Sequence, residues 1–273
     1  MTILVAGHYC HDTLIGNDGA PHRTLGGSAA YISAVLDALG EPCRVVAKVG
    51  DDFLYGKEVS HAPAIVPGRT TAFVDDYRGA ERRQRVEAVA PPILPEELEG
   101  DYQVGIACAI AGELPLPSLR RLRRASRVVV ADAQSILREI SPEGEVLCRP
   151  PEPGALDSID FLKASKSEAR ALDVAALRQR MTLLITDGPR GCQVLSPDVD
   201  LHVPAEPAEE RDPTGAGDCF LAGFAAGLAR GLPLEGAARI GAFCGARAVE
   251  QVGVPRFDPG TARAALRSAE RTR

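Results

Sequence analysis

Short runs of apolar residues alternate with longer segments of helical pattern along the chain, and this alternation restricts the fold more than any other feature. The apolar runs are nearly continuous instead of alternating with polar residues, which is typical of interior strands in a parallel sheet. The pattern predicts an α/β fold with a doubly wound, mainly parallel central sheet flanked by helices. The expected strands are 3–6, 44–49, 104–109, 128–131 and 183–186, and the expected helices between them include 28–39, 117–125 and 167–180.

Two segments depart from this rhythm and predict a small antiparallel sheet. One segment, 12–25, contains the hairpin-type turn Asn17-Asp18-Gly19, and the other, 70–90, contains a turn at 78–81 between β-prone stretches. We expect these segments to form a β lid on a single domain that spans residues 1–273. A surface hairpin without a functional role fits the same pattern nearly as well.

The C-terminal third is mostly helical in pattern. A helix from Ala216 is expected to stop at Gly231, and Pro233 suits the start of the next helix. A last helix is expected over 261–271. The stretch 141–154 is rich in proline and glycine and predicts an exposed loop.

Charge and cysteine usage exclude several classes of partner. The net charge of -6 gives no long-range attraction to nucleic acid or to an anionic membrane, so we expect neither as a partner. No segment reaches the length of a membrane span. Seven cysteines without paired spacing fit a reducing cytoplasm, and neither the cysteines nor the five histidines form a cluster with zinc-ligand spacing. We expect a cytoplasmic protein that is a monomer or a homodimer.

The segment 211–231, RDPTGAGDCFLAGFAAGLARG, places glycines and a carboxylate at the start of an apolar helix. Small residues there leave backbone N–H groups exposed to an anion, which makes the turn a candidate phosphate site. Asp218 is placed to accept a proton from an attacking hydroxyl. Asp212 is placed either to help hold a cation or to cap the helix. The candidate catalytic residues are Gly215, Ala216, Gly217 and Asp218.

Two common nucleotide motifs are absent from the sequence. The nearest match to a Walker loop, at 50–58, has one residue too many between its glycines and a glutamate after its lysine. No G-x-G-x-x-G follows the first strand, so a nicotinamide site has no support.

The run D-P-T-G-A-G-D resembles the signature of the ribokinase-like (pfkB) carbohydrate kinases, and Gly26-Gly27 with the following helix resembles a second signature of that family. Within the family, the stretches GHYCHDTLI, TLGGSAAYISAVLDALG, KVGDDF, FLKASKSEA and DPTGAGDCFLAGF most resemble the plant-type myo-inositol kinases. The resemblance covers nearly the whole chain. It implies phosphorylation of a small-molecule polyol, with ATP and Mg²⁺ as cofactors and K⁺ as a further candidate.

The resemblance also implies residues for the acceptor. Asp12 occupies the place of an aspartate that binds acceptor hydroxyls, although a turn or capping role is the alternative. Gly26 and Gly27 would let backbone N–H groups approach the polyol, while a structural double-glycine turn is also possible. Arg138 is a candidate for a phosphate contact, and for it and Gln134 a role on a helix surface fits as well. The implied acceptor residues are Asp12, Gly26, Gly27, Ser28, Gln134 and Asp218.

On the nucleotide side, the family's N-x-x-E element corresponds to Ser165–Glu168, with serine in place of asparagine. Glu168 is implied as an indirect magnesium contact, although Ser165 and Glu168 also fit a capping box. The family forms its adenine pocket at the positions of Phe243, Cys244, Val249 and Gly253, and a plain core fits them equally. The implied cofactor residues are Lys163, Ser165, Glu168, Thr186, Asp187, Gly188, Gly191, Gly215, Gly217, Cys244 and Val249, with Glu168 and Asp212 for the metal.

The sequence thus predicts an ATP-dependent kinase for a cyclic polyol, with myo-inositol first among the acceptors. A pfkB-type kinase for ribose, fructose or adenosine is the alternative within the family. A non-catalytic family member is the alternative outside enzymes, and the retained Asp218 argues against it.

Overall fold

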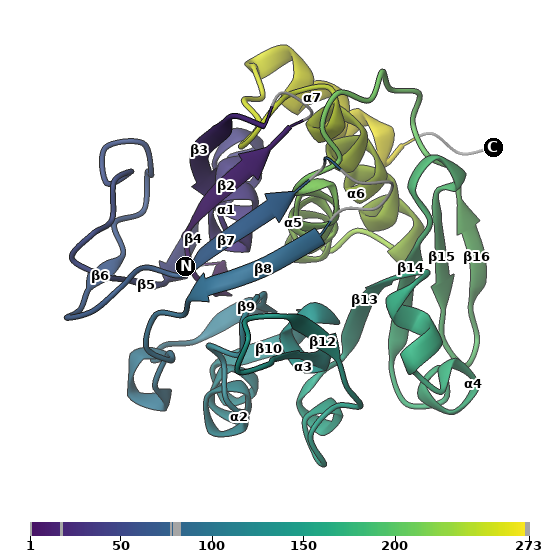
Figure 1. The fold of residues 1–273 in the computed structure, drawn as a ribbon. Helices are drawn as coiled ribbons and strands as arrows, with labels where there is room; N and C mark the ends of the chain where they lie inside the picture. The colour runs from purple at the N-terminus through teal and green to yellow at the C-terminus, as the bar shows by residue number, and fades with distance from the viewer. Residues whose placement is uncertain (1, 17–18, 77, 79–82, 271–273) are drawn as a thin grey trace.

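The structure is a computed structural model that describes residues 2–16, 19–76, 78 and 83–270. Its centre is an eight-stranded sheet with the order β16-β15-β14-β13-β10-β9-β1-β4 (Figure 1). Within this sheet, neighbouring strands pair in parallel from β14 through β13, β10, β9 and β1 to β4. At the other edge, β15 and β16 continue the sheet in antiparallel pairing. The strands are β1 (Ile3–Ala6), β4 (Cys43–Val46), β9 (Tyr102–Ala107), β10 (Ser126–Asp132), β13 (Phe161–Ser165), β14 (Thr182–Thr186), β15 (Cys192–Leu195) and β16 (Asp200–Val203).

Helices cover both faces of this sheet, which confirms the doubly wound α/β prediction (Figure 1). Ile3 and Val5 of β1 face one helical layer, whereas Leu4 and Ala6 face the other, because side chains alternate along a strand. The first layer contains α1 (Ser28–Leu39), α5 (Ala216–Ala229), α6 (Leu234–Val249) and α7 (Pro259–Ser268), and the second contains α2 (Leu116–Ala125), α3 (Gln134–Leu137) and α4 (Val174–Leu177). No helix among the described residues is both long and apolar enough to cross a membrane.

A four-stranded sheet stands beside the main sheet, in the order β3-β2-β7-β8 (Figure 1). Its strands are β2 (Cys10–Ile15), β3 (Pro21–Gly26), β7 (Ala72–Asp76) and β8 (Arg83–Ala88). The two predicted hairpins are present, but they join through parallel pairing of β2 with β7, so the sheet is not wholly antiparallel. Residues 17–18 and 79–81 of the two expected turns lie outside the described residues.

Four expectations about local structure were wrong. The strand expected over 44–49 divides into β4 and β5 (Lys48–Val49), because β5 leaves the main sheet to pair with β6 (Ala64–Ile65). The helix expected over 167–180 breaks into a 3-10 turn and the short α4, since the carboxylate of Asp173 accepts a hydrogen bond from Ala176 N and caps a new helix. The expected loop 141–154 contains β12 (Val146–Cys148), which pairs with β11 (Arg138–Ile140). The last helix begins and ends earlier than expected, since Asp258 caps it.

Candidate active site

The loops that follow the carboxyl ends of the parallel strands converge on two neighbouring pockets, as expected for an open α/β sheet. One pocket, of about 150 Å³, is called the acceptor pocket below, and the other, of about 410 Å³, the donor pocket. Asp132 ends β10, Ser165 ends β13 and Thr186 ends β14, so the sheet itself sets the spacing of these residues.

The first turn of α5 forms a wall between the two pockets. Gly215 and Asp218 line the acceptor pocket, whereas Ala216 and Gly217 line the donor pocket. The N–H groups of Gly217 and Asp218 belong to the first turn, where helix geometry provides no carbonyl partner. One helical turn therefore presents amides and a carboxylate at the boundary between the pockets.

Both glycines of this turn are required by close contacts. Gly215 has a positive φ of 75°, and a Cβ there would lie 2.1 Å from ring atoms of Tyr31. A Cβ on Gly217 would lie 2.5 Å from Nζ of Lys163. The two glycines thus let α5 begin in close contact with the buried ring of Tyr31 and the buried ammonium of Lys163.

The acceptor pocket is lined mainly by polar side chains. Asp12 reaches it from β2 of the smaller sheet and is 8% exposed. Gly26 does not line the pocket, but a Cβ at Gly26 would lie 1.9 Å from Asp12 Oδ2, so this glycine makes room for the carboxylate. Gly27 lines the pocket with a φ of 89°, and its Cβ would lie 2.4 Å from His8 O. The remaining lining residues are Ser28, Tyr31, Phe73, Gln84, Ile110, Gln134, Arg138, Pro213, Thr214, Gly215 and Asp218.

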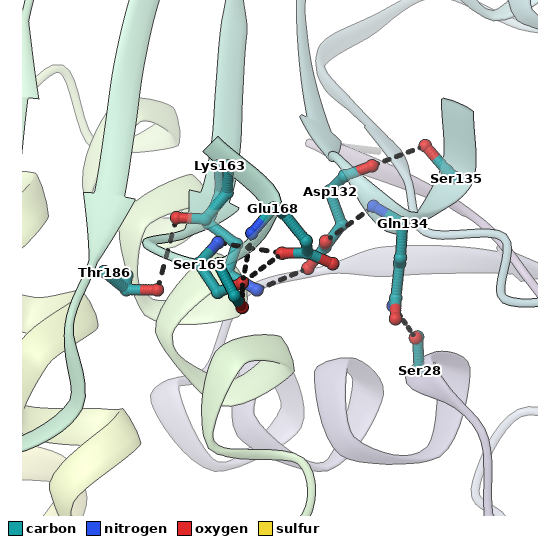
Figure 2. A network of polar contacts seen from close by, with 10 residues as sticks. Ser28, Asp132, Gln134, Ser135, Lys163, Ser165, Glu168 and Thr186 are labelled. Atoms are coloured by element: carbon teal, nitrogen blue, oxygen red, sulfur yellow. Dashed lines mark hydrogen bonds and ion pairs between the residues drawn. The ribbon is translucent and has the colours of Figure 1, made fainter. Parts of the chain in front are cut away.

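Ser28 and Gln134, which line this pocket, belong to a network of polar contacts that continues to Asp132 and Lys163 (Figure 2). Lys163 Nζ donates to Asp132 Oδ2 at 2.7 Å, and both side chains are almost fully buried. Asp132 Oδ1 accepts from the N–H of Gln134 at 3.1 Å, and Gln134 Nε2 donates to Ser28 Oγ at 2.9 Å. Burial opposes the charge of Lys163, but the neighbouring carboxylates, Asp132 first, hold its pKa above the usual value.

Asp218 combines burial with an unsatisfied oxygen. Burial raises the pKa of Asp218 from its usual 3.8 to about 6, and the charge of Asp132 adds to this rise. Asp218 Oδ1 and Thr214 Oγ1 are buried at the acceptor pocket and have no hydrogen-bond partner among the residues that the structure describes. Leaving such atoms unpaired costs about 1–3 kcal/mol each, so their placement favours a ligand with hydroxyl groups.

The donor pocket is lined mainly by small and apolar residues, together with Glu206 and Glu210. Of the residues implied for the nucleotide, Thr186, Gly188, Gly191, Gly217 and Val249 line it. Sequence reasoning missed most of the opposite wall, which the small residues of α6 form. The signal was present in the spacing of Ala242, Gly245, Ala246 and Val249, which share one helix face at i, i+3, i+4 and i+7.

Six of the residues implied for the nucleotide do not line the donor pocket: Lys163, Ser165, Glu168, Asp187, Gly215 and Cys244. Cys244 is fully buried and packs against Gly223 between α5 and α6. The Asp187 carboxylate forms ion pairs with Lys166 at 2.7 Å and with Arg190 at 2.6 Å. Neither side chain lines the donor pocket as the structure describes it.

Ser165 and Glu168 bond to each other beside Thr186 (Figure 2). Glu168 Oε2 accepts from Ser165 N at 2.8 Å and from Ser165 Oγ at 2.7 Å, and the N–H of Glu168 donates to Ser165 Oγ at 3.2 Å. This is the reciprocal geometry of a capping box. Burial opposes ionisation of Glu168, but Lys163 and the bonds from Ser165 hold its pKa below the usual value. Glu168 is therefore an oriented, ionised carboxylate near both Lys163 and Thr186 of the donor pocket.

Asp212 organises the loop before α5. Its Oδ1 accepts from Thr214 N at 2.9 Å, and its Oδ2 accepts from Gly253 N at 3.2 Å. Both donors lie outside α5, whose N-cap is Gly215 without a side-chain cap, so Asp212 closes the preceding loop instead of capping the helix. This loop carries Thr214 into the acceptor pocket.

The sequence of this chain is similar to those of known carbohydrate kinases. Residues 147–259 match the model of the pfkB family carbohydrate kinases. Inositol 3-kinase of Arabidopsis thaliana is 37% identical over 270 residues, which cover 94% of this chain and 76% of that protein. Inositol 3-kinase of Oryza sativa subsp. japonica is 40% identical over 278 residues, covering 94% and 70%.

A solved structure agrees at the level of the fold. A pyrophosphate-dependent kinase in the ribokinase family, in complex with sulfate, superposes with a TM-score of 0.82 at 21% identity, covering 96% of this chain and 100% of that chain. The strand order, the smaller sheet and the extent of similarity to the inositol 3-kinases lead to one assignment. The chain belongs to the pfkB family of carbohydrate kinases.

Proposed function

We propose that the protein transfers the terminal phosphoryl group of ATP to one hydroxyl of myo-inositol, giving a myo-inositol monophosphate substituted at position 3 or 1. The observation that carries this proposal is the α5 turn. Ala216 and Gly217 line the donor pocket, Asp218 lines the acceptor pocket, and the N–H groups of Gly217 and Asp218 have no carbonyl partner within the helix. A group that crosses from one pocket to the other must pass this turn.

The proposed reaction assigns a task to each part of the turn. Asp218 takes the proton from the acceptor hydroxyl as its oxygen attacks the terminal phosphorus. The new O–P bond forms while the bond from that phosphorus to the bridging oxygen breaks, and ADP leaves with the electron pair. The amides at the start of α5 stabilise charge on the phosphoryl oxygens. The proton on Asp218 then passes to water.

Lys163 is placed to assist from beneath the turn. Its ammonium occupies the space that a side chain at Gly217 would fill, which brings a positive charge next to the amides. Its bond to Asp132 at 2.7 Å fixes this position. Lys163 therefore adds to the positive potential at the point where the phosphoryl group would lie.

Magnesium fits the site through Glu168. Hard divalent cations prefer carboxylate oxygens and retained water, and Glu168 is an ionised, oriented carboxylate beside the donor pocket. When bound, the cation would neutralise charge on the nucleotide phosphates, which an acidic protein does not do by itself. The two backbone bonds of Asp212 favour a loop-closing role for that residue.

The acceptor pocket supports a small polyol. Carboxylate, amide, hydroxyl and guanidinium groups surround a volume of about 150 Å³, which suits one ring with several hydroxyls better than a nucleoside. The sequence identity of 37% and 40% with inositol 3-kinases of two plants makes myo-inositol the preferred candidate for the acceptor. Asp12, Phe73 and Gln84 reach the pocket from the smaller sheet, so we propose that this sheet acts as a lid that limits hydrolysis of ATP.

The donor pocket supports ATP over pyrophosphate. Its volume of about 410 Å³ extends past the α5 turn along apolar residues, including Phe220, Ala246 and Val249. A nucleobase and ribose would fill this region, whereas pyrophosphate would leave it empty.

A panel assay tests the proposal. Initial rates are measured with Mg·ATP and myo-inositol, ribose, fructose, cytidine or adenosine, and again with pyrophosphate as the donor. We expect the highest kcat/KM for myo-inositol with ATP. A higher value for another acceptor would reject the inositol assignment, and absence of transfer to every acceptor would support a non-catalytic family member.

A further inference from the structure

Three side chains of metal-ligand type lie together outside both pockets. The ligand atoms of Asp37, Cys43 and His61 all lie within 4.8 Å of one another. Cys43 Sγ is 3.6 Å from His61 Nε2, and Asp37 Oδ1 is 2.9 Å from the same nitrogen. Asp37 lies in the last turn of α1, nine residues and about 14 Å along the axis from Ser28. The cluster is therefore at the opposite end of α1 from the acceptor pocket.

The backbone holds the three residues in place. Asp37 belongs to a helix, and Cys43 is the first residue of β4. His61 lies in the connection between β5 and β6, and its carbonyl oxygen accepts a hydrogen bond from the fully buried Tyr9 at 2.9 Å. The sequence spacing of 6 and 18 residues gave no sign of a site, because the fold brings three separate elements together.

The geometry at His61 does not suit a proton relay. In a Cys–His–Asp relay the thiol and the carboxylate contact different ring nitrogens. Here both contacts converge on Nε2, and one nitrogen of a neutral imidazole either donates or accepts. If both contacts are hydrogen bonds, the thiol and the carboxylate therefore compete for Nε2.

The same geometry suits a tetrahedral cation. With Zn–S of about 2.3 Å and Zn–N and Zn–O of about 2.0 Å, tetrahedral angles place sulfur about 3.5 Å and oxygen about 3.3 Å from the nitrogen. The S···N distance of 3.6 Å is close to the first value, and the O···N distance of 2.9 Å needs a shift of about 0.4 Å at an exposed carboxylate. The side chains of His61 and Asp37 are 23% and 38% exposed, which leaves access for the ion and for a water ligand.

We propose that Asp37, Cys43 and His61 form a binding site for Zn²⁺, with water as the fourth ligand. Thiolate, imidazole and carboxylate together prefer this borderline-soft ion to Mg²⁺. The ion would join the end of α1 and the start of β4 to the segment between β5 and β6. The site is separate from the transfer reaction and does not depend on the proposed activity.

Binding must remove the thiol proton. Burial, and then the charge of Asp37, raise the pKa of Cys43 to about 12, so the thiol is protonated at neutral pH. Formation of the S–Zn bond displaces this proton to solvent, one for each ion bound at Cys43.

Metal titration of matched cysteine variants tests the proposal. Cys43→Ser removes the sulfur ligand, whereas Cys148→Ser removes an exposed cysteine outside the cluster and serves as the control. Each full-length protein is stripped with a chelator, and Zn²⁺ bound at equilibrium is measured by mass spectrometry. We expect one ion per chain for the wild type and for Cys148→Ser, with at least tenfold weaker binding by Cys43→Ser. Equal binding by all three proteins would overturn the proposal.

A second readout reports on the ligands directly. Co²⁺ in place of Zn²⁺ should give a thiolate-to-metal charge-transfer band in the wild type and in Asp37→Asn at higher metal concentration, but not in Cys43→Ser. A band that persists in Cys43→Ser would contradict the site. Kinase activity in Mg²⁺ should be the same for the wild type and Cys43→Ser, which also shows that the variant is folded.

Discussion

The acceptor and donor pockets share one turn of α5 but are built from opposite kinds of surface. The acceptor side consists mainly of polar side chains, two of which, Gln134 and Ser28, are joined by a hydrogen bond of 2.9 Å. The donor side consists mainly of backbone and small residues, such as Ala246 on α6. Under the proposed function, positioned polar groups would recognise the acceptor, whereas shape and exposed amides would recognise the donor.

This difference has an energetic side. The acceptor pocket keeps a carboxylate whose pKa is raised to about 6 and two buried polar atoms that lack partners among the described residues. Such features destabilise a fold and are retained where function needs them. Substitutions on the two sides should therefore impair different steps of binding and transfer.

The largest effect is expected from Asp218→Asn. The amide keeps the shape of the turn but does not accept the hydroxyl proton, so kcat should fall by roughly 10²–10⁴-fold. The dissociation constant of ADP, measured by calorimetry, should change less than threefold, since the donor pocket is untouched. A variant with near-normal kcat would remove Asp218 from the role of base.

Gly217→Ala should damage the wall between the pockets. The new Cβ would lie 2.5 Å from Lys163 Nζ, so either the lysine or the turn must move, and we expect roughly a 10²-fold loss of kcat/KM. Gly236→Ala on α6 is the matched control, because its Cβ meets neighbours only at 3.5 Å. The control should keep full activity. Equal activity in both variants would show that the space above Lys163 is not needed.

A pair of substitutions should separate the two kinds of recognition. Asp12→Asn weakens a charged contact on the acceptor side and should raise KM for myo-inositol by roughly tenfold with little change for ATP. Ala246→Leu fills the donor pocket and should raise KM for ATP by a similar factor with little change for myo-inositol. If each variant altered both constants equally, the proposed division between the pockets would be wrong.

The smallest expected effect is a dependence on pH. Asp218 must be ionised to accept a proton, and its pKa is raised to about 6. The value of kcat/KM should therefore be constant above pH 7 and fall tenfold per unit below pH 6. Circular dichroism at each pH separates this titration from unfolding. A flat profile down to pH 5 would contradict the raised pKa.

Local patterns predicted much of the fold. Continuous apolar runs located β1, β9, β10 and β14, because burial on both faces requires such runs. The motif around Asp218 was recognisable from its glycines. The structure explains why both positions are glycine, because a Cβ at Gly215 would meet Tyr31 and a Cβ at Gly217 would meet Lys163.

Features that depend on long-range contacts escaped prediction. The parallel pairing of β2 with β7 joins strands about 60 residues apart, and no local turn encodes it. The donor wall on α6 looks like ordinary core in sequence, so Cys244 was assigned to the pocket although it faces α5. The cluster of Asp37, Cys43 and His61 likewise exists only after folding.

The most direct test of the central claim follows phosphorus itself. Phosphorus NMR of the enzyme with Mg·ATP and myo-inositol should show ADP and a phosphate monoester in equal amounts, with little orthophosphate. The Asp218→Asn protein should give almost none of the monoester under the same conditions. Formation of ADP and orthophosphate without the monoester would show that the α5 turn does not pass the phosphoryl group between the two pockets.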